Sequence, residues 1–378
     1  MSIRVDPELR HEVREFGAED VDACFNCGNC TAVCRLSRDS TVFPRRIIRY
    51  LQLGLKDRLL QSPEPWLCYY CGECSQTCPR QANPGELMMA MRRYLTSQYD
   101  WTGLSKRLYL SKAWEIAMLL TVGLFVAALF YFLHGPVITD HVELNTFAPV
   151  AWVELGDWVM AAILSFLLLS NAYRMYRFVM SDGDRVRIPP ALYIRELTTL
   201  IVHGLTQKRW SACKMPTRWV KHLVLVFGYV TMLLFVVVFL RWFQTDEIRS
   251  FWHPTRLLGY FATAALLYVT ADAIISRIHK REEIHKHSHP TDWMFLILLF
   301  LTALTGIAVH ILRLGGFPLS TYYMYVVHLM IAVPMLVIEV PFGKWAHLLY
   351  RPLVIYLMRV KERAAELNRS PTATAAVA

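Results

Sequence analysis

Eight of the nine cysteines repeat one spacing, Cys-x2-Cys-x2-Cys-x3-Cys, in two runs. The first run extends from Cys24 to Cys34 and the second from Cys68 to Cys78. This spacing is typical of proteins that bind a pair of [4Fe–4S] clusters, in which the fourth cysteine of each run binds the cluster of the other run. The pattern therefore predicts one-electron chemistry and two ligand sets, Cys24, Cys27, Cys30 with Cys78, and Cys68, Cys71, Cys74 with Cys34.

Structural zinc and disulfide bonds are the alternatives for these cysteines. Zinc sites favour two separated ligand pairs, not four cysteines within eleven residues. Disulfides need an oxidising compartment. Gly28 and Gly72 follow the second cysteine of each run, and a residue without Cβ lets a cluster approach the backbone. Arg35 stands where the second run has Pro79, a small departure from the ferredoxin pattern. The ninth cysteine, Cys213, receives no role, since a lone cysteine is commonly a small buried hydrophobe.

The segment between the two runs reads as helix. Pro44 can open a helix, and apolar residues then recur near helical spacing at Ile47, Ile48, Leu51, Leu55 and Leu59. A second helix is predicted from Pro84 to Tyr99. Helical connections favour an all-α, ferredoxin-like domain over residues 1–108 rather than the compact βαβ bacterial type.

The rest of the chain reads as a membrane domain, residues 109–350, with a cytoplasmic tail over 351–378. Hydrophobic residues make up 55% of the chain, and a transmembrane helix needs about 20 mostly apolar residues. We expect a bundle of six such helices, at about 113–133, 152–173, 220–240, 257–278, 293–312 and 322–340. Buried core helices are the alternative for any one of them, but six with few internal charges favour a membrane.

The cations set the expected orientation. Residues 174–221 carry ten Lys or Arg, whereas residues 135–151 carry none. Because cytoplasmic loops are enriched in Lys and Arg, both ends of the chain and the cysteine runs should face the cytoplasm, at an inner membrane. The formal net charge of +10 is mostly this signal and does not indicate nucleic-acid binding. Residues 1–20 lack the apolar run of a cleavable signal peptide.

No glycine-rich phosphate loop or GxGxxG motif is present, so electrons should enter or leave through a partner protein. A membrane protein that carries clusters also needs a carrier inside the bilayer, commonly haem b with histidine ligands on facing helices. Ionisable residues within membrane helices are functional candidates. The candidate haem ligands are His203, His222, His310, His328 and His347.

The depths of these histidines suggest how they group. His328 and His347 are 19 residues apart, which is roughly 28 Å along a helix. One would serve a haem near the outer face and the other a haem near the inner face. His222 shares the inner depth with His347, and His310 shares the outer half with His328. The alternative for each is an interfacial histidine bonded to backbone. The tract that holds His279, His285, His287 and His289 reads as a solvated loop.

Both parts of the chain resemble known redox proteins. The stretches CFNCGNCTAVC and CYYCGECSQTCP resemble the small iron–sulfur C subunit of heterodisulfide reductases. The stretches HGLTQKRW, RWVKHLVLVFGY, VVHLM and PFGKWAHLLYRPL resemble two b-haem membrane proteins, the E subunit of heterodisulfide reductase and the gamma subunit of nitrate reductase. A chain that joins the two resembles the C subunit of quinone-interacting membrane-bound oxidoreductase (Qmo) complexes. One departure is that the third span contains only His222, where the gamma subunit has two histidines, so His203, His310 and His347 compete for the open places.

The resemblance implies two b haems and menaquinone as substrate. It also implies soluble flavin and iron–sulfur partners, which resemble the A subunit of heterodisulfide reductase, and adenylylsulfate reductase as the electron acceptor. We therefore expect a protein that couples menaquinol oxidation to the clusters in dissimilatory sulfur metabolism and is active only within a complex. A different heterodisulfide-reductase-like or sulfite-linked complex is the nearest alternative. A haemless membrane anchor is a second. A transporter is a third, for which Asp272 is the main buried charge.

Overall fold

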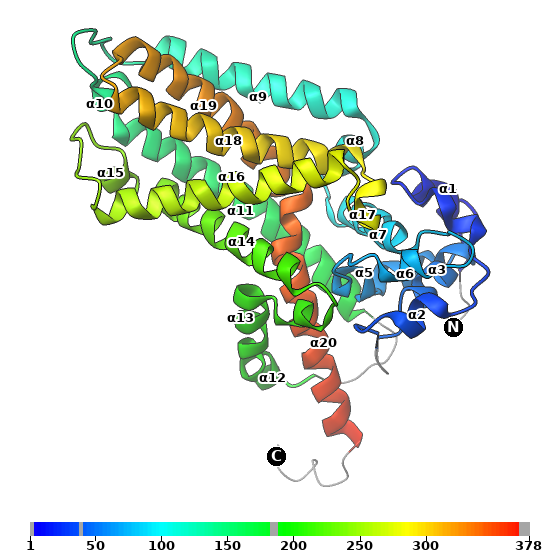
Figure 1. Ribbon diagram of the computed structural model, residues 1–378. Coiled ribbons are helices and arrows are strands. Elements are labelled where there is room, and N and C mark those ends of the chain that lie inside the picture. Colours follow the sequence, from blue (N-terminus) through cyan, green and yellow to red (C-terminus); the bar gives the residue numbers. More distant parts are fainter. Residues whose placement is uncertain (1–3, 38–40, 182–187, 370–378) are drawn as a thin grey trace.

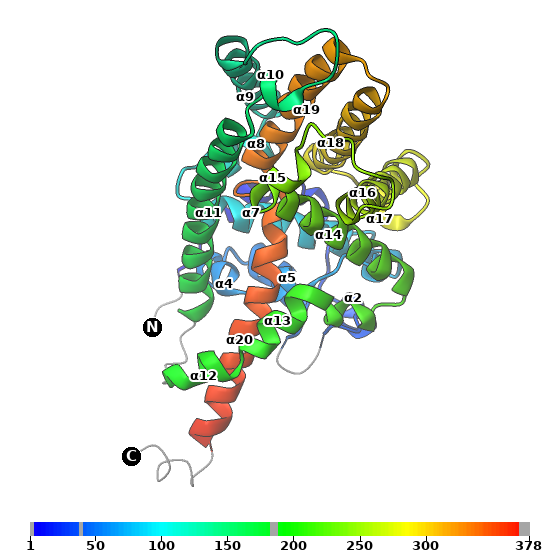
Figure 2. The ribbon, with the colours of Figure 1, turned by 90° about the vertical axis from the view of Figure 1, so that its left-hand side faces the viewer.

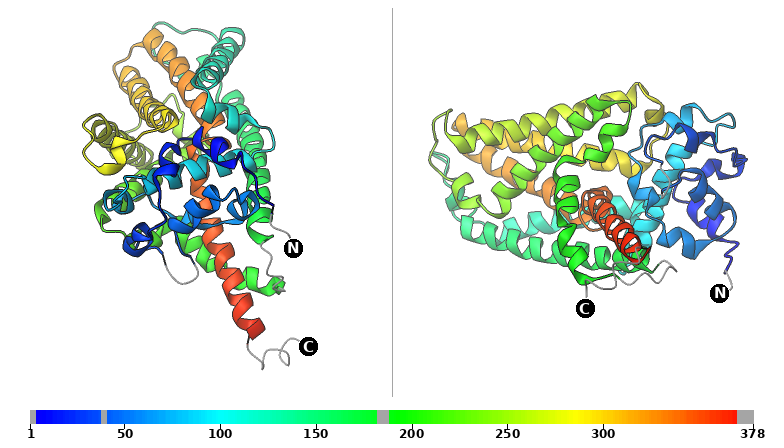
Figure 3. Two further views of the ribbon diagram at one scale, coloured as in Figure 1. Left: turned by 90° about the vertical axis from the view of Figure 1, so that its right-hand side faces the viewer. Right: turned by 90° about the horizontal axis from the view of Figure 1, so that it is seen from below.

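The computed structural model describes residues 4–37, 41–181 and 188–369, and every regular element in these ranges is a helix. A small helical N-terminal part, residues 4–110, covers one end of a bundle of long helices (Figure 1). We call it the N-terminal half and the bundle the membrane half. We call the covered end of the bundle the near end and the opposite one the far end. Figure 2 looks onto the far end, and the left panel of Figure 3 looks onto the N-terminal half. The predicted all-α architecture is confirmed.

The N-terminal half consists of short helices around one long one. They are α1 (Leu9–Arg14), η1 (Glu19–Ala23), α2 (Asn29–Val33), α3 (Arg45–Gln52), α4 (Lys56–Gln61), α5 (Glu64–Leu67), α6 (Glu73–Gln76), α7 (Pro84–Tyr99) and α8 (Leu104–Leu110). The long helix α7 has the predicted bounds. The predicted helical segment from Pro44 to Gln61 is helical but consists of two helices, because the chain turns at Gly54 with φ +66°, a conformation that glycine adopts without strain.

The core of this half forms around α3 and α7. Ile47, Ile48 and Leu51 on one face of α3 have no exposed surface. They belong to the same buried cluster as Leu9 of α1 and Met91 of α7. Burying side chains of this size stabilises by about 1.5–3 kcal/mol each, so the apolar spacing of the linker fixes α3 against α7. Both cysteine runs contact this core: Cys68 belongs to it, and Cys24, Cys34 and Cys71 pack against it.

Six long apolar helices follow, as predicted. They are α9 (Lys112–Leu133), α11 (Val150–Met180), α14 (Pro216–Val237), α16 (Pro254–Ile278), α18 (Pro290–Leu314) and α19 (Pro318–Glu339). Each is long and apolar enough to cross a membrane, and at most 39% of the most apolar stretch of any one is buried inside the protein. Their outward side chains include Leu124, Phe125 and Phe166, all more than 60% exposed. Such a surface is stable in lipid and not in water.

Short helices connect the long ones, and one more long helix ends the described chain. These are α10 (Leu144–Phe147), α12 (Pro190–Arg195), α13 (Leu197–Thr206), η2 (Lys208–Ala212), α15 (Leu240–Phe243), α17 (Glu283–Lys286), η3 (Lys344–Ala346) and α20 (His347–Arg369). The expected domain boundaries at residues 108 and 350 fall inside α8 and α20. Part of the expected tail, residues 370–378, lies outside the described residues, as do Arg185 and Arg187 of the cationic segment.

Helix α20 joins the two halves and is not a free tail. Tyr350, Val354, Leu357 and Val360 on one of its faces are at most 1% exposed. The ring of Tyr350 contacts the rings of Trp66 and Tyr99, with centroids 5.1 and 5.7 Å apart. The right panel of Figure 3 shows α20 and α13 crossing the underside of the molecule. The N-terminal half is therefore held against the bundle by a continuous aromatic and aliphatic core.

Candidate functional site

The two cysteine runs have the same local backbone. In each, the residue two positions after the first cysteine has a positive φ, 56° at Asn26 and 53° at Tyr70. Their backbone N–H groups point at the first cysteine sulfur of the run, with N to Sγ distances of 3.4 and 3.3 Å. Gly28 and Gly72 then directly precede α2 and α6, with φ of 90° and 88°. Hydrogen bonds from N–H groups to sulfur stabilise thiolate ligands.

The structure brings the cysteines together as two mixed sets. Burial, and after it the neighbouring Cys78 and Cys27 thiols, raises the pKa of Cys24. Cys30 is near Cys24 and Cys27.

The other set is built in the same way. Burial, and after it the Cys68 thiol, raises the pKa of Cys34 to about 11. Cys74 is near Cys68 and Cys71. The fourth cysteine of each run thus lies with the first three of the other, the arrangement that a pair of cubane clusters requires.

The donor sets fit clusters and not single ions. In the described ranges, no three His, Cys, Asp or Glu side chains converge tightly enough to hold one ion. A single zinc ion needs four ligands within about 2.3 Å of one point. The thiolates of a cubane each bind a different iron atom and therefore stand further apart. Eight cysteines in two sets of four give each iron of two clusters one thiolate.

The two sets differ in exposure. In the set that contains Cys24, Cys27 is exposed, and the adjacent Phe25 is 70% exposed. In the set that contains Cys34, Cys68 and Cys74 are both buried. We call these the outer set (Cys24, Cys27, Cys30, Cys78) and the inner set (Cys34, Cys68, Cys71, Cys74). The outer set is reachable by a soluble protein.

The inner set lies against the membrane half. A Cβ on Gly72 would meet the side chain of Ile284 at 3.0 Å. The thiol of Cys213 lies beside that of Cys71. The sequence predicts no function for Cys213, because this cysteine lies outside the repeated spacing of the two runs. Its place beside the inner set results from the fold, which brings η2 onto the N-terminal half.

A cavity of about 430 Å³ lies between the residues next to Cys68 and the bundle, and we call it the near cavity. His222 of α14 and His347 of α20 both line it, with ring centroids 5.9 Å apart. An imidazole nitrogen binds a first-row metal at about 2.0 Å, so two imidazoles that would share one metal ion have ring centres no more than roughly 6 Å apart. The spacing fits a haem iron between these two residues.

The hydrogen bonds of His347 leave one nitrogen for a metal. Its Nδ1 contacts the Lys344 carbonyl, which can only accept, so Nδ1 carries the proton and Nε2 keeps its lone pair. Burial, and then the charge of Arg351, lowers the pKa of His347 well below its usual value, so the ring is neutral at pH 7. The Nδ1 of His222 is buried without a hydrogen-bond partner among the described residues. Each ring thus has a nitrogen that could hold a metal.

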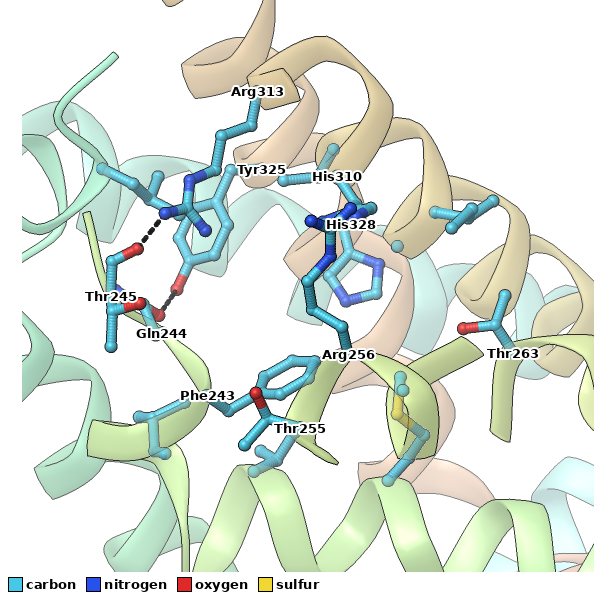
Figure 4. A pocket seen from close by; sticks show the side chains of 18 of the residues that line it. Phe243, Gln244, Thr245, Thr255, Arg256, Thr263, His310, Arg313, Tyr325 and His328 are labelled. Atoms are coloured by element: carbon cyan, nitrogen blue, oxygen red, sulfur yellow. Dashed lines mark hydrogen bonds between the residues drawn. The ribbon is translucent and has the colours of Figure 1, made fainter. Parts of the chain in front are cut away.

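A second cavity, of about 220 Å³, lies at the far end and is lined by His310 of α18 and His328 of α19 (Figure 4). We call it the far cavity. The Thr305 hydroxyl donates to the Leu301 carbonyl at 2.7 Å, so the Nδ1 of His328, 3.0 Å from the same hydroxyl, donates to it. The Nε2 of His328 then keeps its lone pair. A Cβ on Gly306 would lie 3.3 Å from the His328 ring, so this glycine makes room for it.

Unlike that of His328, the Nε2 of His310 has a hydrogen-bond partner among the described residues. The Nε and Nη2 of Arg256 both donate to the Tyr260 hydroxyl, at 3.2 and 2.6 Å, and so occupy both of its lone pairs. That hydroxyl therefore donates to the Nε2 of His310, 2.8 Å away. Figure 4 shows His310, His328 and Arg256 around the same space, and Arg249, Arg313 and Met232 also line it. The arginines are suited to bind carboxylates such as haem propionates.

The structure does not bring His203 to either site. It lies on α13 and lines neither cavity. Burial, followed by the charges of Arg209 and Lys208, lowers its pKa. The candidate histidines thus form one close pair, one pair that shares a cavity, and one residue apart.

Comparison with known proteins supports the N-terminal assignment. Residues 20–82 match the 4Fe-4S dicluster domain family. A protein of Archaeoglobus profundus that is described as like the C subunit of heterodisulfide reductase is 41% identical over 88 residues, which are 23% of this chain and 47% of that protein. The iron-sulfur C subunit of a CoB–CoM heterodisulfide reductase from Methanopyrus kandleri is 35% identical over 96 residues, 23% of this chain and 50% of that protein.

A third relative is the C subunit of an H(2):CoB-CoM heterodisulfide,ferredoxin reductase from Methanothermobacter thermautotrophicus, 35% identical over 77 residues, 20% of this chain and 42% of that protein. The chain spans about half the length of these relatives. No solved structure matches the chain. The chain is therefore an iron–sulfur electron-transfer protein related to the C subunit of heterodisulfide reductase, with two [4Fe–4S] clusters ahead of six candidate membrane helices.

Proposed function

We propose that this chain is the membrane component of a quinone-linked oxidoreductase. Two b haems in the bundle and two [4Fe–4S] clusters in the N-terminal half, when bound, supply one-electron transfer between menaquinol and a soluble partner. Oxidation of one menaquinol releases two electrons and two protons, so single-electron carriers must take the electrons in two steps. The proposed relatives in function are the C subunits of Qmo complexes, which the fused architecture resembles.

One observation carries this proposal: the near cavity is lined both by His222 and His347 and by the backbone segment around Cys68. We call this segment, residues 65–70, the inner-set loop. Trp66, Tyr69 and Tyr70 of that loop line it from the other side. A haem held by the two histidines would thus share a wall with a cluster held by the inner set. Fixed proximity within one chain replaces a docking step between carriers.

The cationic residues of the cavities have a role in this proposal. Lys221 and Lys344 line the near cavity, and Arg256 and Arg313 line the far cavity. Guanidinium and ammonium groups bind carboxylates by charge-assisted hydrogen bonds, so they would hold haem propionates. The near haem would be held by His222 and His347. The far haem would be held by His328, with His310 as the second ligand once it exchanges its Tyr260 hydrogen bond for iron.

The proposed orientation puts the near end at the cytoplasm. Lys and Arg are frequent in the segments that reach the N-terminal half, such as residues 174–221, and cytoplasmic loops carry this excess. The outer set, with the exposed Cys27, then faces a cytoplasmic partner. We propose soluble flavin and iron–sulfur proteins for that partner, with adenylylsulfate reductase beyond them. The alternatives are another heterodisulfide-reductase-like or sulfite-linked complex, or a haemless anchor.

Replacing His328 with alanine should remove the far haem and leave the near one, because His328 is the far-cavity histidine whose Nε2 is free. The measurement is haem per chain, with a redox titration of the remaining b-type absorbance. Full haem content with unchanged midpoint potentials would exclude His328 as a ligand. The His310→Ala variant tests whether His310 is the second ligand of the far haem. If it keeps both haems, Met232, which lines the same cavity, is the better candidate.

A bulkier residue at Gly306 should have the same selective effect. Its Cβ would already lie 3.3 Å from the His328 ring, and valine adds two methyl groups there. Overpacking of this kind typically costs about 1–3 kcal/mol, so Gly306→Val should lower far-haem occupancy by about tenfold or more while the near haem stays. Gly204→Val is the matched control, because nothing lies within 4 Å of that position. Equal haem content in the two variants contradicts a haem at His328.

A further inference from the structure

Three arginines from three helices donate hydrogen bonds to backbone carbonyls of the inner-set loop, residues 65–70. Arg351 of α20 donates to the carbonyls of Trp66 and Cys68 at 3.1 and 3.4 Å. Arg92 of α7 donates to the carbonyl of Pro65 at 2.6 Å and also to that of Cys68. Arg218 of α14 donates to the carbonyl of Tyr70 at 3.3 Å. The backbone on both sides of Cys68 is therefore enclosed by guanidinium groups.

Among the residues that the structure describes, no carboxylate affects the charge of Arg351 or Arg92. Arg351 is only 7% exposed, and the groups that favour its charged form are Tyr69, Cys68 and Cys213. Burial, and then Arg351 itself, lowers the pKa of Arg92 to about 9. Arg218 has one distant carboxylate, Glu282 at 3.6 Å. Buried charges are normally paired, so two adjacent arginines require an anion next to them.

The anion that fits is the cluster itself. A [4Fe–4S] cluster with four thiolate ligands is negatively charged and becomes more negative on reduction. Burial disfavours that added charge. Fixed cations beside the inner set oppose this penalty, and cluster potentials depend on net charge, hydrogen bonding and exposure.

Two of the three arginines lie one helical turn from the two near-cavity histidines. Arg218 and His222 are four residues apart on α14, and His347 and Arg351 are four residues apart on α20. Residues at this spacing share a helix face. Each of these helices therefore presents a histidine to the near cavity and an arginine to the inner-set loop.

We propose that Arg92, Arg218 and Arg351 raise the reduction potential of the inner cluster and so make it the first acceptor of electrons from the membrane half. The inference deepens the proposed function and rests on it for the electron donor. The effect on the cluster itself depends only on the inner set.

Arginines also lie near the outer set, but their side chains are exposed to solvent. Arg45 and Arg49 are exposed and line a surface hollow with Cys24. Exposed charges are screened by solvent and salt, so these arginines affect the outer cluster much less. Replacement of the buried Arg351 should therefore act on one cluster only.

The test is a potentiometric titration of both clusters by electron paramagnetic resonance in the full-length chain. Arg351→Gln should lower the affinity of the inner cluster for its electron at least tenfold, which is about 59 mV for a one-electron couple. The outer cluster should not move. Arg351→Lys should restore at least half of the shift, because it keeps the charge. Arg58→Gln, an exposed arginine of α4, is the control and should change neither potential.

Each outcome supports or overturns the proposal. An assembled Arg351→Gln protein with an unchanged inner potential, or with equal shifts of both clusters, overturns it. Loss of the inner cluster in Arg351→Gln but not in Arg351→Lys supports a charge requirement. Loss in both variants overturns it in favour of a purely structural anchor. Haem content is measured in the same samples, so a chain without haem contradicts the proposed function but leaves the potential shift readable.

Discussion

Replacing His347 with alanine is expected to remove the near haem and to stop menaquinol from reducing the clusters. His347 faces His222 across the near cavity at 5.9 Å between ring centroids, and its Nε2 is the free nitrogen. Changes to groups that only orient a metal ligand cost about 10–100-fold, so loss of the ligand should slow quinol-dependent cluster reduction by more than about a hundredfold. Chemical reduction of the clusters by dithionite should be unaffected, because their ligands are intact.

The matched control is His279→Ala, which changes an exposed histidine at the end of α16. It should keep both haems and the full rate. Added imidazole should restore part of the haem in His347→Ala, because it can occupy the vacated space. A His347→Ala protein with two haems per chain and normal quinol-dependent reduction would contradict the assignment of the near cavity.

Replacing Cys34 with serine is expected to damage the cluster of the second run, although Cys34 belongs to the first. The Cys34 thiol lies beside those of Cys68 and Cys71, whereas Cys78 lies beside Cys24. About half of the cluster iron should be lost, and the remaining resonance signal should be that of the outer cluster.

Two reference variants identify which cluster is lost. The spectrum of Cys34→Ser should match that of Cys68→Ser and differ from that of Cys24→Ser. Cys213→Ser should retain all cluster iron, because Cys213 contacts Cys71 but belongs to neither set. A Cys34→Ser spectrum that matches Cys24→Ser instead would show that each run serves its own cluster.

The cysteine runs and the long helices were predictable because their signals are local. Four cysteines within eleven residues determine the ligand type without knowledge of the fold, and each apolar stretch of about 20 residues reads as one helix. The break of the linker at Gly54 was less visible, since the apolar spacing from Ile47 to Leu59 continues through it. The turn is specified by the single positive φ of that glycine.

The role of α20 was harder to predict, because its charges are also those of a cytoplasmic tail. Its mean composition is polar, with Arg351, Arg359 and Lys361 among its residues. A signal was present, however: Tyr350, Val354, Leu357 and Val360 recur at helical spacing. A stripe of this kind indicates a buried face, which here packs on the N-terminal half.

The arginines around the inner set depend on the tertiary structure. The spacing of Arg218 from His222 and of His347 from Arg351 can be read from the sequence, but not the carbonyls that they bind. Those carbonyls lie more than 140 residues away along the chain. The Tyr260 bond to His310 likewise joins two helices, so the sequence could not separate this histidine from His328.

The most direct test of the account is a reduced-minus-oxidised optical spectrum of the purified full-length chain, combined with haem and iron analysis of the same sample. Two haems per chain should give b-type absorption bands, together with iron for two [4Fe–4S] clusters. A chain with its full cluster iron but no b-type bands would contradict it and leave the six long helices as a haemless anchor.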